Sequence, residues 1–99
     1  MIKRIVSMHF LPGTEGHFLD IFENIKHEIR SQRGCMGLEL LVEANQTAEK
    51  TFWTISFWHS IDDLETYRTS PLFQKTWPEV KALFASRAKA WTLNSLDSL

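Results

Sequence analysis

The sequence predicts an α+β domain with a ferredoxin-like β-α-β-β-α-β order, in which a four-stranded antiparallel sheet carries its helices on one face. Two observations favour this fold. Stretches with strand-like alternation and stretches with helical periodicity follow one another in this order along 99 residues, a length that suits one domain over residues 1–99. The strand-like stretches are also apolar on both faces, so the face without helices is expected to pack against a second copy of the chain.

The first strand is expected over Ile2–Leu11 and the first helix over Glu15–Ser31. Alternation along the strand places Ile2, Val6, Met8 and Phe10 on one side and Ile5 and Leu11 on the other. Apolar residues recur in the helix at three- and four-residue spacing, namely Phe18, Ile21, Phe22, Ile25 and Ile29. Thr14 is expected to cap the start of this helix, and Gly34 lies beyond its last apolar position, where glycine commonly ends a helix.

A short second strand is expected over Gly37–Glu43 and a third over Thr51–His59, joined by a polar hairpin loop over Ala44–Lys50. The third strand also has two apolar faces. Its two sets of side chains are Trp53, Ile55 and Phe57 on one side and Phe52 and Trp58 on the other. Alternation alone leaves open which of these faces meets the helices.

The second helical region is expected to begin with Ser60 as its cap and to be interrupted by its two prolines. Proline suits the first helical turn and disfavours helix in the residue before it. The predicted helical pieces are therefore Ile61–Arg68, Pro71–Thr76 and Pro78–Ala85. The tail Ala88–Leu96 completes the sheet as a strand with Trp91 and Leu93 on one face.

Composition narrows the classes of function. Eleven basic against twelve acidic side chains give a net charge of −1, which lacks the basic excess that nucleic-acid binding requires. Cys35 is the only cysteine, so an intrachain disulfide is excluded and a cytoplasmic location is expected. Apolar runs fall short of the roughly 20 residues that cross a bilayer, and the N-terminus lacks the apolar stretch of a signal peptide, so no membrane association is expected.

Four segments resemble the antibiotic biosynthesis monooxygenase (ABM) domain family. They are IKRIVSMHF, FLDIFENIKHEIR, GCMGLELL and, most specifically, FWTISFWHSIDDLETYRTSPLFQKTWPEVKALFASRAKAW. The family consists of small dimeric α+β barrels that include quinol monooxygenases and haem-degrading enzymes. The resemblance implies a homodimer that forms through the sheet faces.

The resemblance also implies a cofactor-independent monooxygenase, in which a quinol-like or phenolic aromatic substrate supplies the electrons to O2 and neither metal nor flavin is required. Such a substrate would lie in an apolar pocket between sheet and helices. Trp58, Phe73 and Trp77 would shape this pocket, and Tyr67 or His9 would bind the oxygen of the substrate. Arg68 would stabilise an anion.

Each of these residues also has a structural interpretation. Trp58 could wedge a strand against a helix, Tyr67 could be a core residue, Arg68 could be solvated, and His9 could belong to the dimer interface. A non-catalytic protein that binds an aromatic compound, a fatty acid or haem is therefore an alternative. A purely structural dimer module, whose own side chains fill the pocket, is a third hypothesis.

The chain departs from the haem-degrading branch of the family. Where that branch has an asparagine, a tryptophan and an axial histidine, this sequence has Val6, Tyr67 and Trp77, so haem degradation is not expected. Many members also have a histidine where Thr69 stands here. No metal site is expected either, because His9 and His59 should lie at opposite ends of the sheet.

Overall fold

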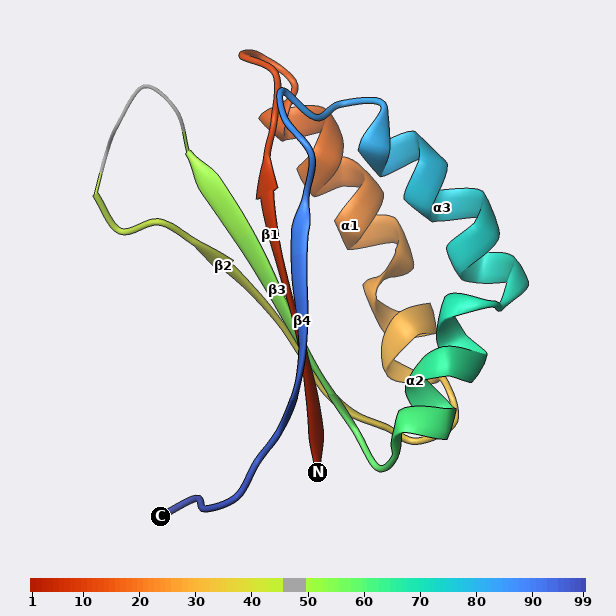
Figure 1. Cartoon of the computed structure of the whole chain (residues 1–99). Coiled ribbons are helices and arrows are strands. Elements are labelled where there is room, and N and C mark those ends of the chain that lie inside the picture. Colours follow the sequence, from red (N-terminus) through yellow and green to blue (C-terminus); the bar gives the residue numbers. More distant parts are fainter. Residues whose placement is uncertain (46–49) are drawn as a thin grey trace.

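Residues 1–45 and 50–99, which the computed structural model describes, form one antiparallel four-stranded sheet and three helices, and the helices lie on one face of the sheet (Figure 1). The elements are β1 (Ile2–His9), α1 (Glu15–Arg30), β2 (Cys35–Val42), β3 (Thr51–Trp58), α2 (Ile61–Arg68), α3 (Pro71–Lys81) and β4 (Lys89–Asn94). This order confirms the predicted ferredoxin-like fold. The hairpin loop predicted over Ala44–Lys50 includes residues 46–49, which lie outside the described residues.

The strand order is β2-β3-β1-β4, which places β1 and β3 at the centre of the sheet. The two central strands are antiparallel, with Ile2 opposite Trp58 and His9 opposite Thr51. His9 and His59 therefore lie at opposite ends of the sheet, as the sequence predicted. Because side chains alternate along a strand, β1 and β3 contribute side chains to both faces of the sheet.

The even-numbered side chains of β1 and β3 face the helices and form the core. Met8, Phe10 and Phe52 pack with Phe18 of α1 and Val80 of α3 in one buried cluster. A second cluster joins the sheet to α2, and it contains Ile2, Cys35, Trp58 and Leu64. This arrangement answers the question that the sequence left open, since the Phe52 and Trp58 face of β3 meets the helices.

The odd-numbered side chains form the opposite face, which we call the free face. Its described residues include Ile5, Ile55 and Trp91, which stand side by side on neighbouring strands. The indole of Trp91 stacks on Trp53, with 6.5 Å between ring centroids. In the described part of the chain no helix covers this face (Figure 1), so apolar side chains line it without cover.

Capping explains most of the helix starts. Ser60 and Ser70 each accept a hydrogen bond from the backbone three residues later, at 3.1 Å and 3.2 Å, so both act as N-caps. Thr14 occupies the predicted N-cap position of α1, but its side chain makes no capping hydrogen bond, because its hydroxyl donates to the carbonyl of Leu11 at 2.7 Å.

The break predicted at Pro78 is also wrong, because α3 runs through this residue to Lys81. A proline inside a helix leaves the carbonyl four residues earlier without its N–H donor. Here that carbonyl belongs to Gln74, and both Gln74 and Pro78 are exposed, so this side of the helix is open to solvent, which is the environment in which a proline inside a helix is least costly. Within the described residues, no helix has the length and apolar character that a membrane span requires.

Two glycines allow a matched test of the turn between α1 and β2. Gly34 has φ of 79°, and a Cβ placed there would lie 2.5 Å from the Cβ of Asp63, whereas a Cβ on Gly16, in the first turn of α1, would meet open space. We expect Gly34→Ala to lower the free energy of unfolding by about 1–3 kcal/mol, because alanine is strained at positive φ. Gly16→Ala should raise it by about 0.5–1 kcal/mol, because it reduces the entropy of the unfolded chain. Urea denaturation of both variants measures the two effects, and equal signs would contradict this account.

Candidate functional site

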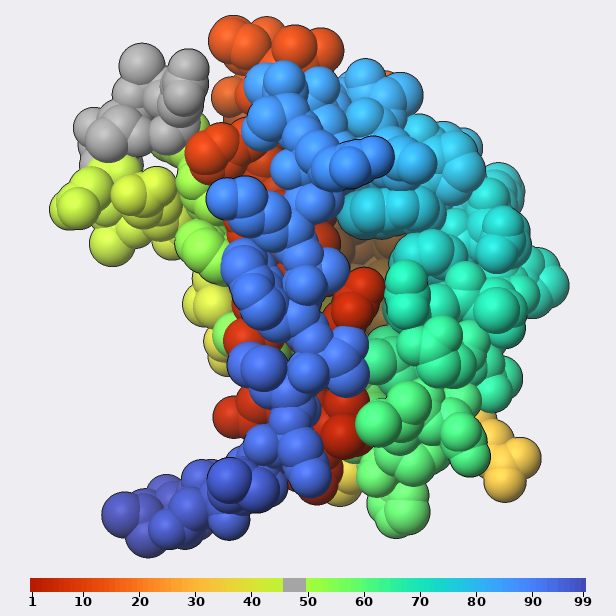
Figure 2. All heavy atoms as spheres, in the orientation of Figure 1, coloured from red at the N-terminus to blue at the C-terminus, as the bar shows by residue number. Residues whose placement is uncertain are grey.

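A cavity of about 220 Å³ lies between the sheet and the helices. Strands β1, β2, β3 and β4 supply its lining on one side, and helices α1, α2 and α3 supply it on the other. Figure 2 shows a recess between β4 and the helices α2 and α3, with atoms of α1 visible at its bottom. The apolar lining residues include Val6, Met8, Phe18, Phe22, Ile25, Leu38, Phe73, Trp77 and Val80. A cavity of this size and character suits a substituted one- or two-ring aromatic compound, since an engineered cavity of about 150 Å³ binds benzene.

An aromatic ladder forms the helical side of the site. Tyr67 stacks on Trp58 with 5.1 Å between ring centroids, and its edge meets Phe73 at 5.4 Å. Phe73 in turn stacks on Trp77 at 5.7 Å. Tyr67, Phe73 and Trp77 line the cavity. These contacts fix the orientation of the rings before a ligand enters.

Trp58 lies behind the aromatic ladder and does not line the cavity. Its side chain is fully buried, and its indole N–H donates to the Oγ of Ser56 at 2.9 Å. Ser56 and Tyr67 both line the cavity, so Trp58 holds two lining residues from behind. The wedging role that the sequence offered as an alternative is the one that the geometry supports.

Tyr67 is a polar group in this otherwise apolar wall. Burial, and to a lesser extent the nearby Cys35, raise the pKa of its phenol to about 12. The phenol is therefore protonated at neutral pH. In that state its hydroxyl is a hydrogen-bond donor toward an oxygen of a ligand.

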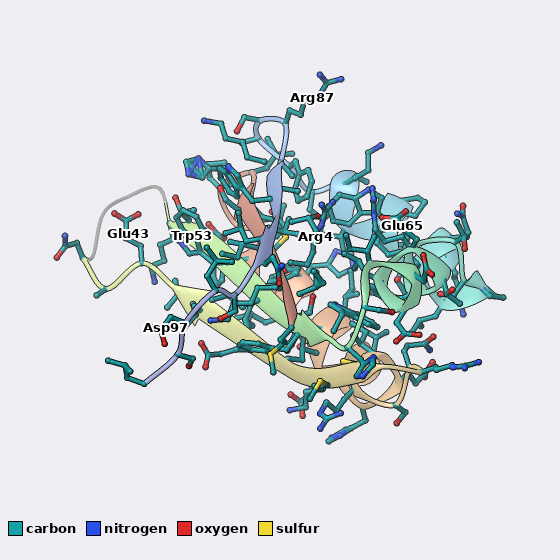
Figure 3. The ribbon with its side chains drawn as sticks, turned by 60° about the horizontal axis from the view of Figure 1, so that its bottom comes forward. Arg4, Glu43, Trp53, Glu65, Arg87 and Asp97 are labelled. Carbon is teal, nitrogen blue, oxygen red and sulfur yellow. The ribbon has the colours of Figure 1, made fainter. Side chains whose placement is uncertain are left out.

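Two arginines lie at the opening of the cavity, and both line it. Arg4 projects from β1 and donates to the Oγ1 of Thr92 on β4 at 2.7 Å. Arg68, at the end of α2, donates to the Oε1 of Glu65 at 3.0 Å, and the Glu65 side chain is 52% exposed. In Figure 3, Arg4 lies between the sheet and the helices, with Glu65 on the helical side. Burial, and then the charge of Arg68, lower the pKa of Arg4.

The lining contains no carboxylate and no imidazole among the described residues. Its other polar groups are hydroxyls, and the Thr76 hydroxyl already donates to the carbonyl of Leu72 at 2.8 Å. The site can therefore hold a flat apolar ring, donate a hydrogen bond and stabilise a negative charge. Within the described residues, no group of His, Cys, Asp and Glu side chains has the geometry to hold a metal ion.

The structure separates the two residues that were predicted to bind the substrate oxygen. Tyr67 lies in the cavity, whereas His9 lies on the free face, where its ring hydrogen-bonds to the Oγ1 of Thr51. His9 therefore does not reach this cavity. The structure places Arg68, Phe73 and Trp77 in the lining of the same cavity as Tyr67.

Arg4 lines the cavity but is not among the site residues predicted from the sequence. A signal was present, because alternation places Arg4 on the same side of β1 as Ile2, Val6 and Met8. A charged residue within the apolar side of a central strand is uncommon unless it has a partner or a function.

A family model described as antibiotic biosynthesis monooxygenase matches residues 1–78. No match was found among the curated proteins. Among solved structures, an antibiotic biosynthesis monooxygenase has a TM-score of 0.86 and 16% identity, with 98% of this chain and 100% of that chain covered. Rv0793 from Mycobacterium tuberculosis has a TM-score of 0.83 and 18% identity, with 98% and 96% covered.

A mutant of SnoaB, a cofactor-independent oxygenase from Streptomyces nogalater, is also similar. Its TM-score is 0.81 at 16% identity, with 99% of this chain and 96% of that chain covered. At these identities the structural likeness shows a shared fold.

Tyr67 can be titrated directly, because it is the only tyrosine in the chain. In the folded protein we expect phenolate absorbance to rise with a midpoint at about 12, and in denaturant at the ordinary value near 10.0. Since the folded-state pKa is the higher one, the associated stability is complete below pH 10 and is lost as the pH rises through 12. Circular dichroism recorded in parallel identifies unfolding. A midpoint near 10 in the folded protein would contradict the buried environment.

Proposed function

The chain belongs to the antibiotic biosynthesis monooxygenase family, and from this premise we propose that it is a cofactor-independent monooxygenase that oxidises a small phenolic or quinol-like aromatic compound with O2. The observation that carries the proposal is the cavity, in which an aromatic wall, a protonated Tyr67 hydroxyl and two guanidinium groups surround a space of about 220 Å³. An aromatic ring bearing an ionisable hydroxyl complements all three features.

In the proposed reaction the ring itself reduces O2. The phenol first loses its proton, and the phenolate then passes an electron to O2. The resulting radical pair combines at the ring carbon para to the oxygen, and the hydroperoxide formed there loses water. One oxygen atom of O2 becomes the second oxygen of the quinone. The other oxygen atom leaves as water, whose two hydrogens correspond to the phenolic hydrogen and the hydrogen displaced from the para carbon.

The protein contributes charge stabilisation and positioning in this scheme. Tyr67 donates a hydrogen bond to the substrate oxygen, and Arg68 stabilises the anion with Arg4. Because the described lining offers no carboxylate or imidazole, the proton leaves to solvent through the opening. Positive charge near the substrate phenol lowers the pKa of its hydroxyl, so the substrate can lose its proton without a general base. Phe73 and Trp77 hold the ring.

The same absence of a base among the described lining residues favours one other candidate function. A protein that holds an aromatic compound or a fatty acid without transforming it needs only the apolar wall and the arginines. Such a protein would be stabilised by its ligand and would release it intact. Recovery of the ligand after incubation in air separates the two functions.

We also propose that two copies of the chain associate through the free face. Trp53 and Trp91 stack there in the open, and Ile5 and Ile55 extend the apolar surface across the central strands. Figure 3 shows Trp53 on the side of the sheet away from the helices. Burial of this surface against its own copy would remove apolar area from water at about 25 cal/mol per Å².

Oxygen consumption tests the catalytic proposal. With naphthols and phenols that have a free para carbon, the wild-type protein should consume O2 faster than buffer and yield the quinone. Tyr67→Phe should lower kcat/KM about 100-fold, because it removes the hydrogen bond to the developing charge. Thr66→Val removes an exposed hydroxyl from the same helix and serves as the control. Turnover no faster than buffer across the panel, with no effect of Tyr67→Phe, would remove the proposal.

Sedimentation equilibrium tests the proposed dimer. Trp91→Glu should convert dimers to monomers at micromolar concentration, because it places a charge on the free face. Leu19→Glu, on the outer surface of α1, is a matched control, since Leu19 is 41% exposed and Trp91 42%. A wild-type protein that sediments as a monomer would overturn the dimer.

A further inference from the structure

We propose that Arg4 and Arg68 form a subsite for a carboxylate, so that the preferred substrate is an aromatic acid that carries both a phenolic hydroxyl and a carboxylate. This inference rests on the proposed function, because it names the substrate class of the same cavity. It goes beyond the stabilisation of a transient phenolate, since it requires an anion that is present in the ground state.

The two guanidinium groups reach the opening from opposite walls. Arg4 comes from the inner face of the central strand β1, where its backbone is paired with Ser56 on one side and Thr92 on the other. Arg68 comes from the last residue of α2. Leu64 of α2 packs against Trp58 of β3, and this packing places both arginines in the lining of the same cavity.

The charges at this opening are not balanced. Arg4 is half-buried, and its hydrogen-bond acceptor is the neutral hydroxyl of Thr92. Glu65 forms an ion pair with Arg68, and because Glu65 is exposed, water weakens the attraction between the two charges. Two positive groups and one negative group leave one positive charge in excess. A bound monoanion would neutralise that excess. Burial first, and then the charge of Arg68, lower the pKa of Arg4, so an anion would also offset the unfavourable effect of Arg68 on Arg4.

A carboxylate fits this arrangement better than other anions. Its two oxygens match the planar fork of a guanidinium group, and charge-assisted hydrogen bonds of this kind are stronger than neutral ones. A single charge equals the local excess. The cavity behind the arginines is apolar and lined by Tyr67, Phe73 and Trp77, so the group that carries the carboxylate should be a flat ring.

The test is a binding experiment under anaerobic conditions, so that no turnover occurs. The probes are 1-hydroxy-2-naphthoate and its methyl ester, which differ in the charge of the carboxyl group and in one methyl group. The wild-type protein should bind the acid at least about tenfold more tightly than the ester, because the acid adds a charged hydrogen-bonded pair. Added salt should weaken binding of the acid and leave that of the ester unchanged.

Variants locate the effect. In Arg4→Met the preference for the acid should fall to within about threefold while the affinity for the ester is retained, and Arg4→Lys should keep part of the preference. Lys75→Met removes an exposed cation from α3 outside the cavity and should leave the preference unchanged. Melting curves without ligand show whether each variant is folded.

Three outcomes would overturn the proposal. They are equal binding of acid and ester by the wild-type protein, an Arg4→Met preference equal to the wild-type preference, and octanoate binding as tight as that of the hydroxynaphthoate. Oxygen consumption separates this proposal from the proposed function. Tight binding of the acid without turnover would support the subsite and remove the monooxygenase, whereas turnover of the ester alone would keep the monooxygenase and remove the subsite.

Discussion

The alternation of side chains along the two central strands is the constraint on which the rest of the structure depends. Since β1 and β3 are antiparallel and in register, their even-numbered residues all point to the helices and their odd-numbered residues all point away. One face therefore provides both the core and the cavity, and the other provides the free face. A shift of one residue in either strand would exchange these roles and expose the core.

The cavity exists because the helices pack against the two ends of the sheet in separate clusters. One cluster contains Phe18 and Phe52, and the other contains Trp58 and Leu64. The space between them is bridged by the aromatic ladder that starts at Tyr67, whose ring stacks on Trp58 and contacts Phe73. Rings that are fixed by one another leave the space open without collapse, because closure would cost their stacking contacts.

Local patterns in the sequence were sufficient for the fold and insufficient for the site. Strand alternation, helical periodicity and the serine cap at Ser60 depend on neighbouring residues, so they were predicted correctly. Pro78 was misjudged because tolerance of a proline depends on whether the orphaned carbonyl reaches water, which is a tertiary property. Arg4 and Arg68 are 64 positions apart in the sequence. These two cations come near each other only because α2 packs on the sheet. Alternation places His9 on the side of β1 that carries Ile5, and only the packing of the helices on the other side makes His9 remote from the cavity.

The charged groups of the described lining are two arginines, and a general base is absent from it. A carboxylate placed beside Arg4 would neutralise it and remove its attraction for an anionic ligand. The strand instead pairs Arg4 with the hydroxyl of Thr92, which fixes the guanidinium group without cancelling its charge. An arginine held in this way is less favourable for folding than an apolar residue at the same position would be. Packing alone would therefore favour another residue on the inner face of this central strand, and the proposed anion subsite gives Arg4 a role there.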